Sequence, residues 1–230
     1  MGFTYMNNAK IIAVTQPTYS DPITGYKVSI DEFVAFVARV SNPSNQNNHE
    51  TAPKLLRYLA KHKHWSPFEM VNIVMEIETT RDIARQILRH RSFSFQEFSQ
   101  RYADPTQDLG WVDNRETRLQ DTKNRQNSIE TDDRNLMNMW ESYQRDVIRK
   151  ASGAYQWAIE NGIAKEQARA VLPEGLTVSR MYMNGTLRSW IHYCQLRMGV
   201  ETQKEHRDVA TDAWYQITQV FPSLKDALDI

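Results

Sequence analysis

Residues 71–78 of the sequence, VNIVMEIE, alternate between apolar and polar side chains. Successive side chains of a strand point to opposite faces, so this period of two places the apolar ones on a single face. They are Val71, Ile73, Met75 and Ile77. A strand of this kind needs neighbouring strands and a second layer that covers its apolar face. The segment therefore predicts a sheet with one buried face.

Helical spacing governs most of the remaining chain. Ser29 followed by Glu32 is a capping-box pattern, which predicts a helix that stops at Ser41. A longer pattern predicts the longest helix over 132–161, ending before Gly162. The apolar stripe of that helix is expected to serve packing. Its members are Leu136, Met139, Trp140, Tyr143, Val147, Ala151, Ala154 and Ile159.

The other predicted elements are shorter. Strands are expected at 10–18 and 177–183, and helices at 54–63, 80–88, 164–172, 187–196 and 202–221. The polar segment 103–131 has no clear period, and we expect a long loop with short strands, a candidate cover over a site. Because strands and helices do not alternate as βαβ units, the predicted fold class is α+β. We expect a single domain over residues 1–230 with a modest, mostly antiparallel sheet and several long helices.

Composition narrows the class of function. Among 230 residues, 28 are Lys or Arg and 28 are Asp or Glu, and this zero net charge argues against a non-specific nucleic-acid binder. Cys194 is the one cysteine, which favours a reducing cytoplasm, or a host cell's cytoplasm if the source is viral. No apolar run long enough for a membrane span occurs. Without a GxGxxG or a P-loop, a nucleotide would be bound by another kind of site.

The stretch 89–102, RHRSFSFQEFSQRY, is the strongest candidate for chemistry. The guanidiniums of Arg89 and Arg91 suit a phosphate or diphosphate, because each can donate paired hydrogen bonds. Three interleaved phenylalanines can hold a flat ring or pack in a core. A helix end whose basic residues face water explains the same charges without any ligand.

The spacing of this stretch decides between these interpretations. RHR, seven residues and then Ser closely resembles the signature of the flavin-dependent thymidylate synthases, which differ in fold from the classical thymidylate synthase. Gln86, Glu97, Arg101 and Tyr102 extend the match. The likeness reaches from ARVSN at 38–42 to the helix after 201, whereas segment 103–131 carries little of it.

The resemblance implies a flavin site. The arginines of RHR would lie on the phosphate region of FAD, and His90 would lie near the flavin ring and the folate. In the turn HWSPFEM, His64 and Ser66 match flavin contacts, with Ser66 in place of a threonine and Met70 where many members have a histidine. Thr186 and His192 stand where Asn is common. The implied cofactor-binding residues are Ser41, His64, Ser66, Arg89, His90, Arg91, Glu97, Thr186, Arg188 and His192.

The resemblance also implies a nucleotide site. The matching residues are Gln86, Arg89, Glu97, Ser99, Gln100, Arg101, Arg169 and Arg197. Gln100 stands where the family often has Gly, and Arg169 is a lone arginine among small and apolar residues, which must be paired or lie at a cleft. Arg197 is the implied catalytic residue, which would stabilise the N3-deprotonated uracil ring and so make C5 more nucleophilic. Without the resemblance, Arg197 is explained as a cation that stabilises a helix C-terminus through the helix dipole.

Cys194 is expected to be a small packed residue, although classical thymidylate synthases use a cysteine nucleophile. It lies in the middle of a predicted helix between Tyr193 and Gln195 and lacks the Pro-Cys context. We expect Ser99 to position the nucleotide, since no histidine and carboxylate relay surrounds it. No metal site is predicted.

The family reaction implied here converts dUMP to dTMP. Methylenetetrahydrofolate would supply the carbon and NADPH would reduce FAD, in a homotetramer with sites shared between subunits. Two alternatives remain: a flavin- and folate-dependent uracil methylase acting on RNA, and a non-catalytic nucleic-acid-binding module that stacks bases on Phe93, Phe95 and Phe98. The expected partners are dUMP, folate and NADPH, with no nucleic acid and no membrane.

Overall fold

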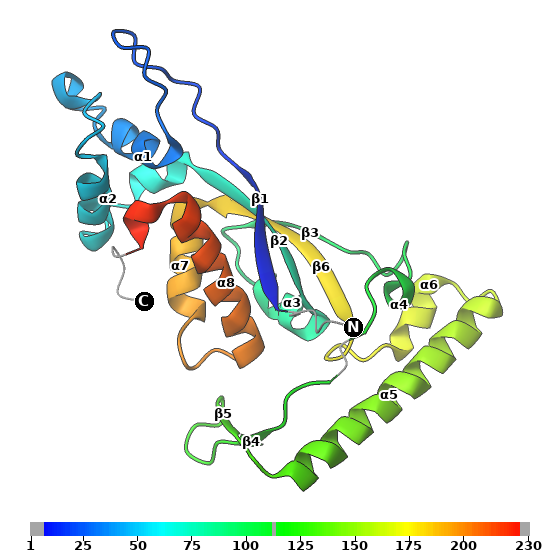
Figure 1. Ribbon diagram of the computed structural model, residues 1–230. Coiled ribbons are helices and arrows are strands. Elements are labelled where there is room, and N and C mark those ends of the chain that lie inside the picture. The colour runs from blue at the N-terminus through cyan, green and yellow to red at the C-terminus, as the bar shows by residue number, and fades with distance from the viewer. Residues whose placement is uncertain (1–6, 112–113, 226–230) are drawn as a thin grey trace.

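A four-stranded antiparallel sheet forms the centre of the molecule (Figure 1). The computed structural model describes residues 7–111 and 114–225. The strands lie in the order β1, β2, β6, β3, and each neighbouring pair is antiparallel. Their bounds are Asn8–Val14 (β1), Asn72–Thr80 (β2), Ser94–Glu97 (β3) and Val178–Thr186 (β6). The arrangement confirms the α+β class.

One face of the sheet is buried, as the alternation in β2 predicts. Ile73, Met75 and Ile77 are fully buried, whereas Glu76 and Glu78 on the opposite face are only half-buried. Three helices pack into the core against the buried face (Figure 1). They are α3 (Arg81–Ile87), α7 (Leu187–Arg197) and α8 (Lys204–Val220). The last turn of α3 and the end of α7 are thereby brought to one end of this layer.

Two helices lie at the other end of the sheet (Figure 1). They are α1 (Ile30–Ala38) and α2 (Ala52–Lys61), with the short 3-10 helices η1 (Pro43–Asn45) and η2 (Ser66–Met70). The capping box is confirmed, because Ser29 and Glu32 exchange both of its hydrogen bonds. α1 ends at Ala38, earlier than predicted. Arg39 is buried and its guanidinium donates to the carbonyl of Asn48 and to Thr51, which draws the chain into the loop.

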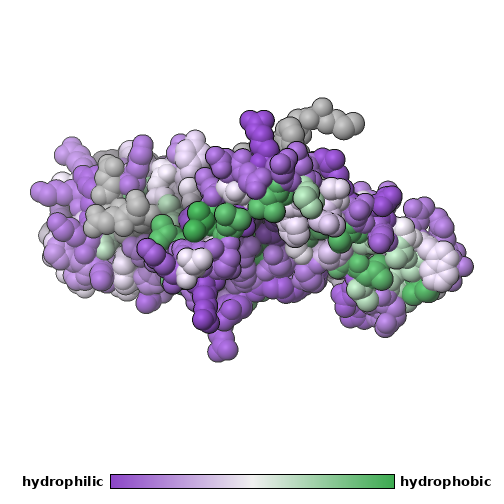
Figure 2. Space-filling model, turned by 90° about the horizontal axis from the view of Figure 1, so that it is seen from below, coloured by the Kyte–Doolittle hydropathy of each residue, from purple (hydrophilic) through white to green (hydrophobic). Residues whose placement is uncertain are grey.

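The longest helix, α5 (Arg134–Glu160), lies beside the sheet rather than on it (Figure 1). Tyr155 and Ala158 near its end form a second small core with Ala168 and Leu172. The expectation that the whole stripe packs is therefore wrong within one chain. The buried stripe residues lie toward the end of the helix, and farther back Gln144 is buried, where it hydrogen-bonds with the backbone of Arg115. Figure 2, seen from below, shows hydrophobic side chains on the open surface of this side. The exposed members of the stripe are Leu136, Met139, Trp140, Tyr143, Ala154 and Val147.

The polar segment 103–131 contains the short strands that were expected. β4 (Arg118–Gln120) and β5 (Ser128–Glu130) form a hairpin, and α4 (Pro105–Asp108) precedes it. The remaining short elements are α6 (Lys165–Ala168), η3 (Arg169–Val171) and η4 (Pro222–Leu224).

Several predicted boundaries are wrong. β1 begins and ends earlier than 10–18, and β6 runs three residues beyond 183 because it pairs with both β2 and β3. β3 was not predicted, since four residues are too few to show a period. The helix expected at 164–172 divides into α6 and η3. Thr80 is the N-cap of α3, but its hydroxyl donates to the carboxylate of Asp82 instead of capping the backbone.

Candidate active site

The basic signature follows α3 directly, so the helix fixes where the turn begins. Arg89, His90 and Arg91 lie in the turn between α3 and β3. Phe93 anchors this turn against β6 at Gly185, where an added Cβ would lie 2.4 Å from the ring of Phe93. Only a glycine at position 185 permits that approach. The turn is therefore fixed by α3 at one end and by the sheet at the other.

His90 and Arg197 meet at the centre of the candidate site. Arg197 is the last residue of α7, and its Nε donates to Nε2 of His90 at 2.9 Å. Burial first, and then the charges of Arg197 and Arg89, lower the pKa of His90 to about 4. His90 is accordingly a neutral acceptor at Nε2, which leaves its proton on Nδ1. In the part of the chain that the structure describes, the two terminal nitrogens of the Arg197 guanidinium have no protein partner.

Aromatic rings surround His90. Its ring lies edge-on to Tyr193, with ring centres 5.0 Å apart, and to Phe93 at 6.4 Å. Tyr193 is buried, and burial raises its pKa well above the ordinary value. The edge-on contacts hold the imidazole of His90 in one orientation. They thereby also fix the guanidinium of Arg197, which donates to that imidazole.

A buried histidine that the sequence reasoning missed lies behind this pair. His206 of α8 is fully buried, and its ring centre is 6.3 Å from that of His90. Its Nε2 lies 3.1 Å from the Tyr193 hydroxyl and its Nδ1 lies 3.4 Å from Oε1 of Gln86. Gln86 in turn donates from Nε2 to Gln203 at 2.8 Å. The only signal in the sequence was a polar residue at a helix position that faces the core.

Arg89 and Arg91 are exposed, and neither forms an ion pair within the described residues. Two unpaired guanidiniums beside a neutral imidazole suit an anionic diphosphate next to a ring. This donor set therefore fits the phosphate region of a flavin nucleotide.

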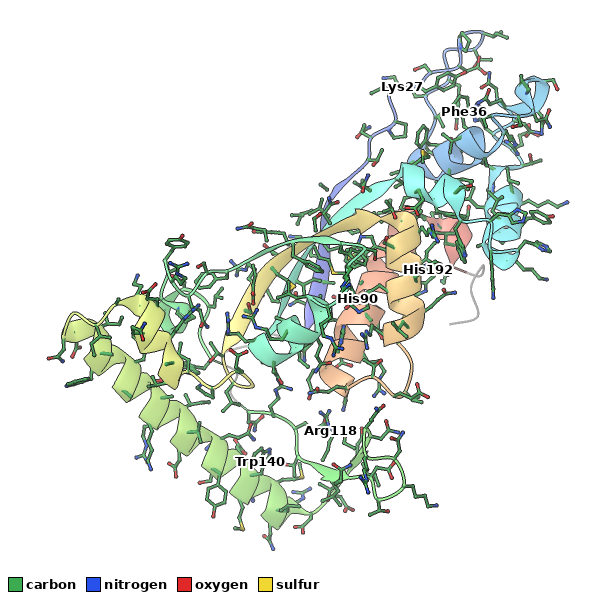
Figure 3. All side chains as sticks on the ribbon, turned by 180° about the vertical axis from the view of Figure 1, so that it is seen from behind. Lys27, Phe36, His90, Arg118, Trp140 and His192 are labelled. Atoms are coloured by element: carbon green, nitrogen blue, oxygen red, sulfur yellow. The ribbon has the colours of Figure 1, made fainter. Side chains whose placement is uncertain are left out.

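A second group of predicted residues lies around the start of α7. Thr186 caps that helix, and Arg188 donates to Glu69 of η2 at 2.7 Å. The ring of His192 lies edge-on to Trp65, with centres 4.9 Å apart, and burial followed by the charge of Arg188 lowers its pKa. In Figure 3, His90 lies nearer than His192 to the C-terminal end of α7. The exposed residues His64 and Ser66 belong to this group, at the turn that leads into η2.

A third group lies where β3 ends. Glu97 accepts from Ser179 at 2.8 Å and pairs with Arg85 at 3.3 Å, so it is not a solvated surface carboxylate. Gln100 is buried, and its Nε2 has no partner in the described structure. Arg101 pairs with Glu166 of α6 at 3.4 Å.

Two other predicted residues stand apart from these groups. Arg169 is half-buried on η3 and has no hydrogen bond or ion pair from its side chain among residues 7–111 and 114–225, which leaves a position at a cleft as the expected alternative to pairing. Ser99 lies half-buried in the turn that carries Arg101, and Ser41 is exposed beyond the end of α1.

One chain does not bring all the predicted residues together. α7 has 11 residues, so its two ends lie roughly 16 Å apart. Thr186 marks one end and Arg197 the other. Within one chain, the structure joins His90, Arg197 and Gln86, whereas the residues around η2 and those after β3 form separate groups.

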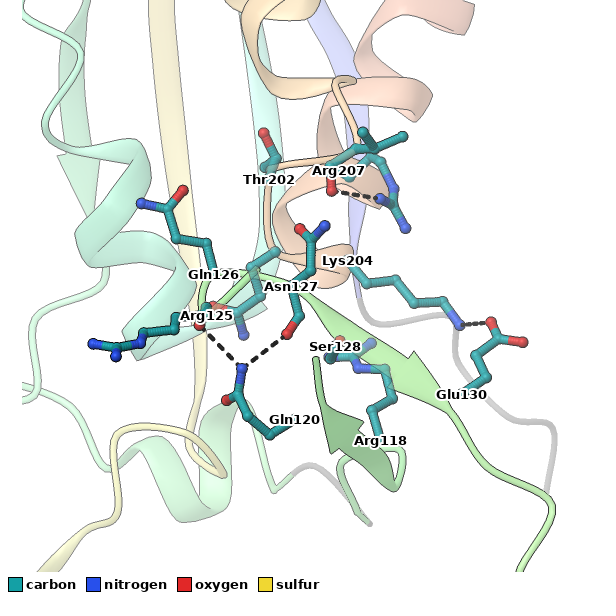
Figure 4. Close-up of a pocket in the computed structure, with 12 residues that line it drawn as sticks. Arg118, Gln120, Arg125, Gln126, Asn127, Ser128, Glu130, Thr202, Lys204 and Arg207 are labelled. Carbon is teal, nitrogen blue, oxygen red and sulfur yellow. Dashed lines mark hydrogen bonds and ion pairs between the residues drawn. The ribbon is translucent and has the colours of Figure 1, made fainter. Parts of the chain in front are cut away.

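A cleft of about 440 Å³ opens beside Gln203, between the β4–β5 hairpin and the start of α8 (Figure 4). Arg118, Arg125, Lys204 and Arg207 line it, and Glu130 pairs with Lys204 at 3.5 Å. The polar segment thus contributes one wall of a basic cleft next to the candidate site.

The structure separates Cys194 from any surface chemistry. The thiol is fully buried in α7, and burial raises its pKa. A thiol in this state is a poor nucleophile. Within residues 7–111 and 114–225, no cluster of three or more His, Cys, Asp or Glu residues could hold a metal ion, and no described helix is long and apolar enough to cross a membrane.

The comparisons with known proteins agree with this geometry. The family model described as "Thymidylate synthase complementing protein" matches residues 24–223. The chain is 45% identical over 222 residues to a probable flavin-dependent thymidylate synthase of Paramecium bursaria Chlorella virus 1, a match that covers 96% of this chain and 99% of that protein. It is 44% identical, with the same coverage, to the flavin-dependent thymidylate synthase of Synechocystis sp..

A solved structure shows the same fold. A UMP/dUMP methylase, PolB from Streptomyces cacaoi, crystallised with 5-Br dUMP, matches with a TM-score of 0.74 at 24% identity. The match covers 96% of this chain and 93% of that one. With the family model and two relatives spanning nearly the whole sequence, the chain belongs to the flavin-dependent thymidylate synthase family of enzymes.

Proposed function

We propose that this enzyme methylates dUMP to dTMP with FAD as cofactor, methylenetetrahydrofolate as the one-carbon donor and NADPH as the reductant. The observation that carries the proposal is the pair formed by His90 and Arg197. A neutral histidine accepts from Nε of the arginine and leaves two parallel N–H donors for a ligand. That arrangement suits the O2 or O4 edge of a uracil ring together with N3.

Arg197 would act electrostatically. A guanidinium at N3 favours the deprotonated ring, and the added electron density makes C5 a better nucleophile toward the methylene carbon. Because His90 is neutral, it accepts from Nε without compensating the positive charge of Arg197, which stays available to the uracil anion. Glu97, Ser99, Gln100, Arg101 and Arg169 would bind the rest of the nucleotide, as the family likeness implies.

The residues fit a flavin nucleotide. Arg89 and Arg91 would bind its phosphate region, and His64, Ser66, Thr186, Arg188 and His192 would bind the ring and the remaining parts, with Ser41 and Glu97 beside them. Bound flavin supplies the hydride that turns the transferred methylene into a methyl group. The protein would hold the flavin and the uracil nucleotide in fixed relative positions and exclude water from them.

We further propose that the active enzyme is a homotetramer with sites shared between subunits. The predicted residues form separate groups in one chain, so a complete site needs parts of more than one copy. The exposed stripe of α5 supplies a surface for such assembly, because Trp140, Tyr143 and Val147 line an apolar groove of about 320 Å³ beside Leu176. Exposed apolar surface of this kind marks interaction sites.

The proposal also covers the domain organisation and the location of the protein. Residues 1–230 would act as one catalytic domain, and the lone buried thiol favours a cytoplasmic location, that of a host cell if the source is viral.

The test is a spectrum followed by a reaction. Purified protein should show a flavin absorption band that denaturation releases. It should form dTMP from dUMP over repeated turnovers only when methylenetetrahydrofolate and NADPH are both present. Methyl transfer to uracil in RNA, with none to dUMP, would favour the RNA methylase. Absence of flavin together with tight binding to single-stranded nucleic acid would favour the binding module.

A further inference from the structure

A directed chain of hydrogen bonds runs through the core behind Gln86. It starts at Tyr193, passes through His206 to Gln86, continues to Gln203 and ends at Glu205. The successive donor–acceptor distances are 3.1, 3.4, 2.8 and 3.0 Å. Tyr193, His206 and Glu205 are all buried, so none of these groups can exchange its partner for bulk water.

The carboxylate end of the chain fixes its direction. Glu205 accepts from Arg118 at 2.6 Å and lies 3.5 Å from a guanidinium nitrogen of Arg115, which together keep it ionised. An ionised carboxylate only accepts hydrogen bonds. Gln203 must therefore turn its Nε2 toward Glu205 and its Oε1 toward Gln86.

The remaining orientations follow from this one. Gln86 has to donate from Nε2 to Gln203, and its Oε1 then faces His206. His206 can satisfy that oxygen only with a proton on Nδ1, and its Nε2 is left as an acceptor for the Tyr193 hydroxyl. The opposite arrangement would place two oxygens against each other at Glu205 and leave the buried tyrosine proton without a partner.

We propose that His206 is a positioning residue that holds the Gln86 amide in one of its two orientations for nucleotide binding. The inference rests on the proposed function in one respect, since Gln86 is taken as a nucleotide-binding residue. With the chain intact, Gln86 keeps one N–H and one oxygen lone pair free, in fixed places. Without the His206 contact, Gln203 alone opposes rotation of the amide, so a half-turn that exchanges its donor for its acceptor costs less.

Burial keeps this hydrogen-bond arrangement the same over the physiological pH range. The pKa of His206 is lowered to about 3, chiefly by burial and then by the charge of Arg197, so the imidazole stays neutral under physiological conditions. A charged His206 would carry protons on both nitrogens and would clash with the tyrosine donor unless that hydroxyl turned away.

Two substitutions separate positioning from packing. His206→Asn places an amide near the position of Nδ1 and can still donate to Gln86, whereas His206→Gln reaches the position of Nε2 and can still accept from Tyr193. If His206 positions Gln86, His206→Asn should bind dUMP within about twofold of wild type, and His206→Gln should bind it roughly tenfold more weakly, the worth of one good hydrogen bond. Equal loss in both variants, at equal flavin content and melting temperature, would overturn the inference.

Neutron diffraction from crystals of the wild-type protein gives a measurement that needs neither nucleotide nor variant. Deuterium should occupy Nδ1 of His206 and Nε2 of Gln86 on the side of Gln203. Deuterium on Nε2 of His206 would overturn the proposal even if both variants failed to fold. A wild-type protein that shows this pattern but binds no dUMP would contradict the proposed function and leave the positioning of Gln86 intact.

Discussion

At the scale of single residues, the site depends on protons held in fixed places. Arg197 was predicted to end a helix and meet the substrate, and the structure adds that His90 accepts from its Nε. The sequence could not show this, because 107 residues separate the two side chains. His206 was missed for the same reason: its role depends on Gln86 and Tyr193, which the fold alone brings to it.

Replacing Arg197 with lysine tests the electrostatic role. An ammonium group keeps the charge but cannot present two parallel donors, and it loses the contact of Nε with His90. We expect turnover to fall on the order of a hundredfold, about 3 kcal/mol of transition-state stabilisation, while flavin affinity changes little. Steady-state dTMP formation and a flavin titration on the same preparation measure both quantities. Near-normal turnover would return Arg197 to a helix-dipole role.

Because His206 is buried as a neutral imidazole, the free energy of unfolding should fall as the pH is lowered. The unfolded imidazole takes up a proton below its ordinary pKa of 6.5, whereas the folded one stays neutral down to about 3. The stabilisation is therefore complete above pH 6.5 and declines as the pH falls toward 3, by up to about 1.4 kcal/mol per pH unit. Urea unfolding at several pH values between 5 and 6.5 should give a shallower pH dependence for His206→Asn than for wild type. Identical slopes would show that His206 is protonated in the folded state.

At the scale of secondary structure, local patterns predicted the helices well and the sheet only in part. The capping box at Ser29 and the alternation in β2 depend on neighbours in sequence, and both were confirmed. β3 and the length of β6 depend on pairing between distant strands, which a short window cannot contain. The stripe of α5 was predicted correctly as a pattern, but its burial was wrong because one chain does not cover it.

The exposed stripe of α5 gives a prediction about assembly. Tyr143 is 60% exposed and lines the apolar groove with Trp140. Tyr143→Glu puts a charge into the surface that we propose is covered by another subunit, so it should shift the protein toward smaller species and lower its activity. Ser142→Glu is the matched control, because Ser142 is exposed and lies about 100° around the helix axis from Tyr143, outside the apolar stripe. Sedimentation analysis that finds the same mass for Tyr143→Glu and wild type would exclude this face from the assembly.

At the scale of the whole molecule, the fold holds the candidate residues in separate groups. The sheet and α7 hold Arg197 at one end and the residues around η2 at the other, while Glu97 ends β3 and Arg101 lies in the turn after it. Sequence reasoning found most of the candidate residues through one signature and its spacing. It could not find their grouping, because that grouping depends on how the helices lie on the sheet.

The fate of the folate tests the central claim most directly. If the hydride comes from the flavin, the carbon donor gives up only its methylene group and leaves as tetrahydrofolate. If the folate supplied the hydride itself, it would leave as dihydrofolate. The measurement is a single turnover, with the protein's flavin reduced beforehand, then mixed with dUMP and methylenetetrahydrofolate without NADPH, and with products separated by chromatography. We predict equal amounts of dTMP, tetrahydrofolate and reoxidised flavin. Dihydrofolate formed in step with dTMP, while the flavin stays reduced, would contradict the account.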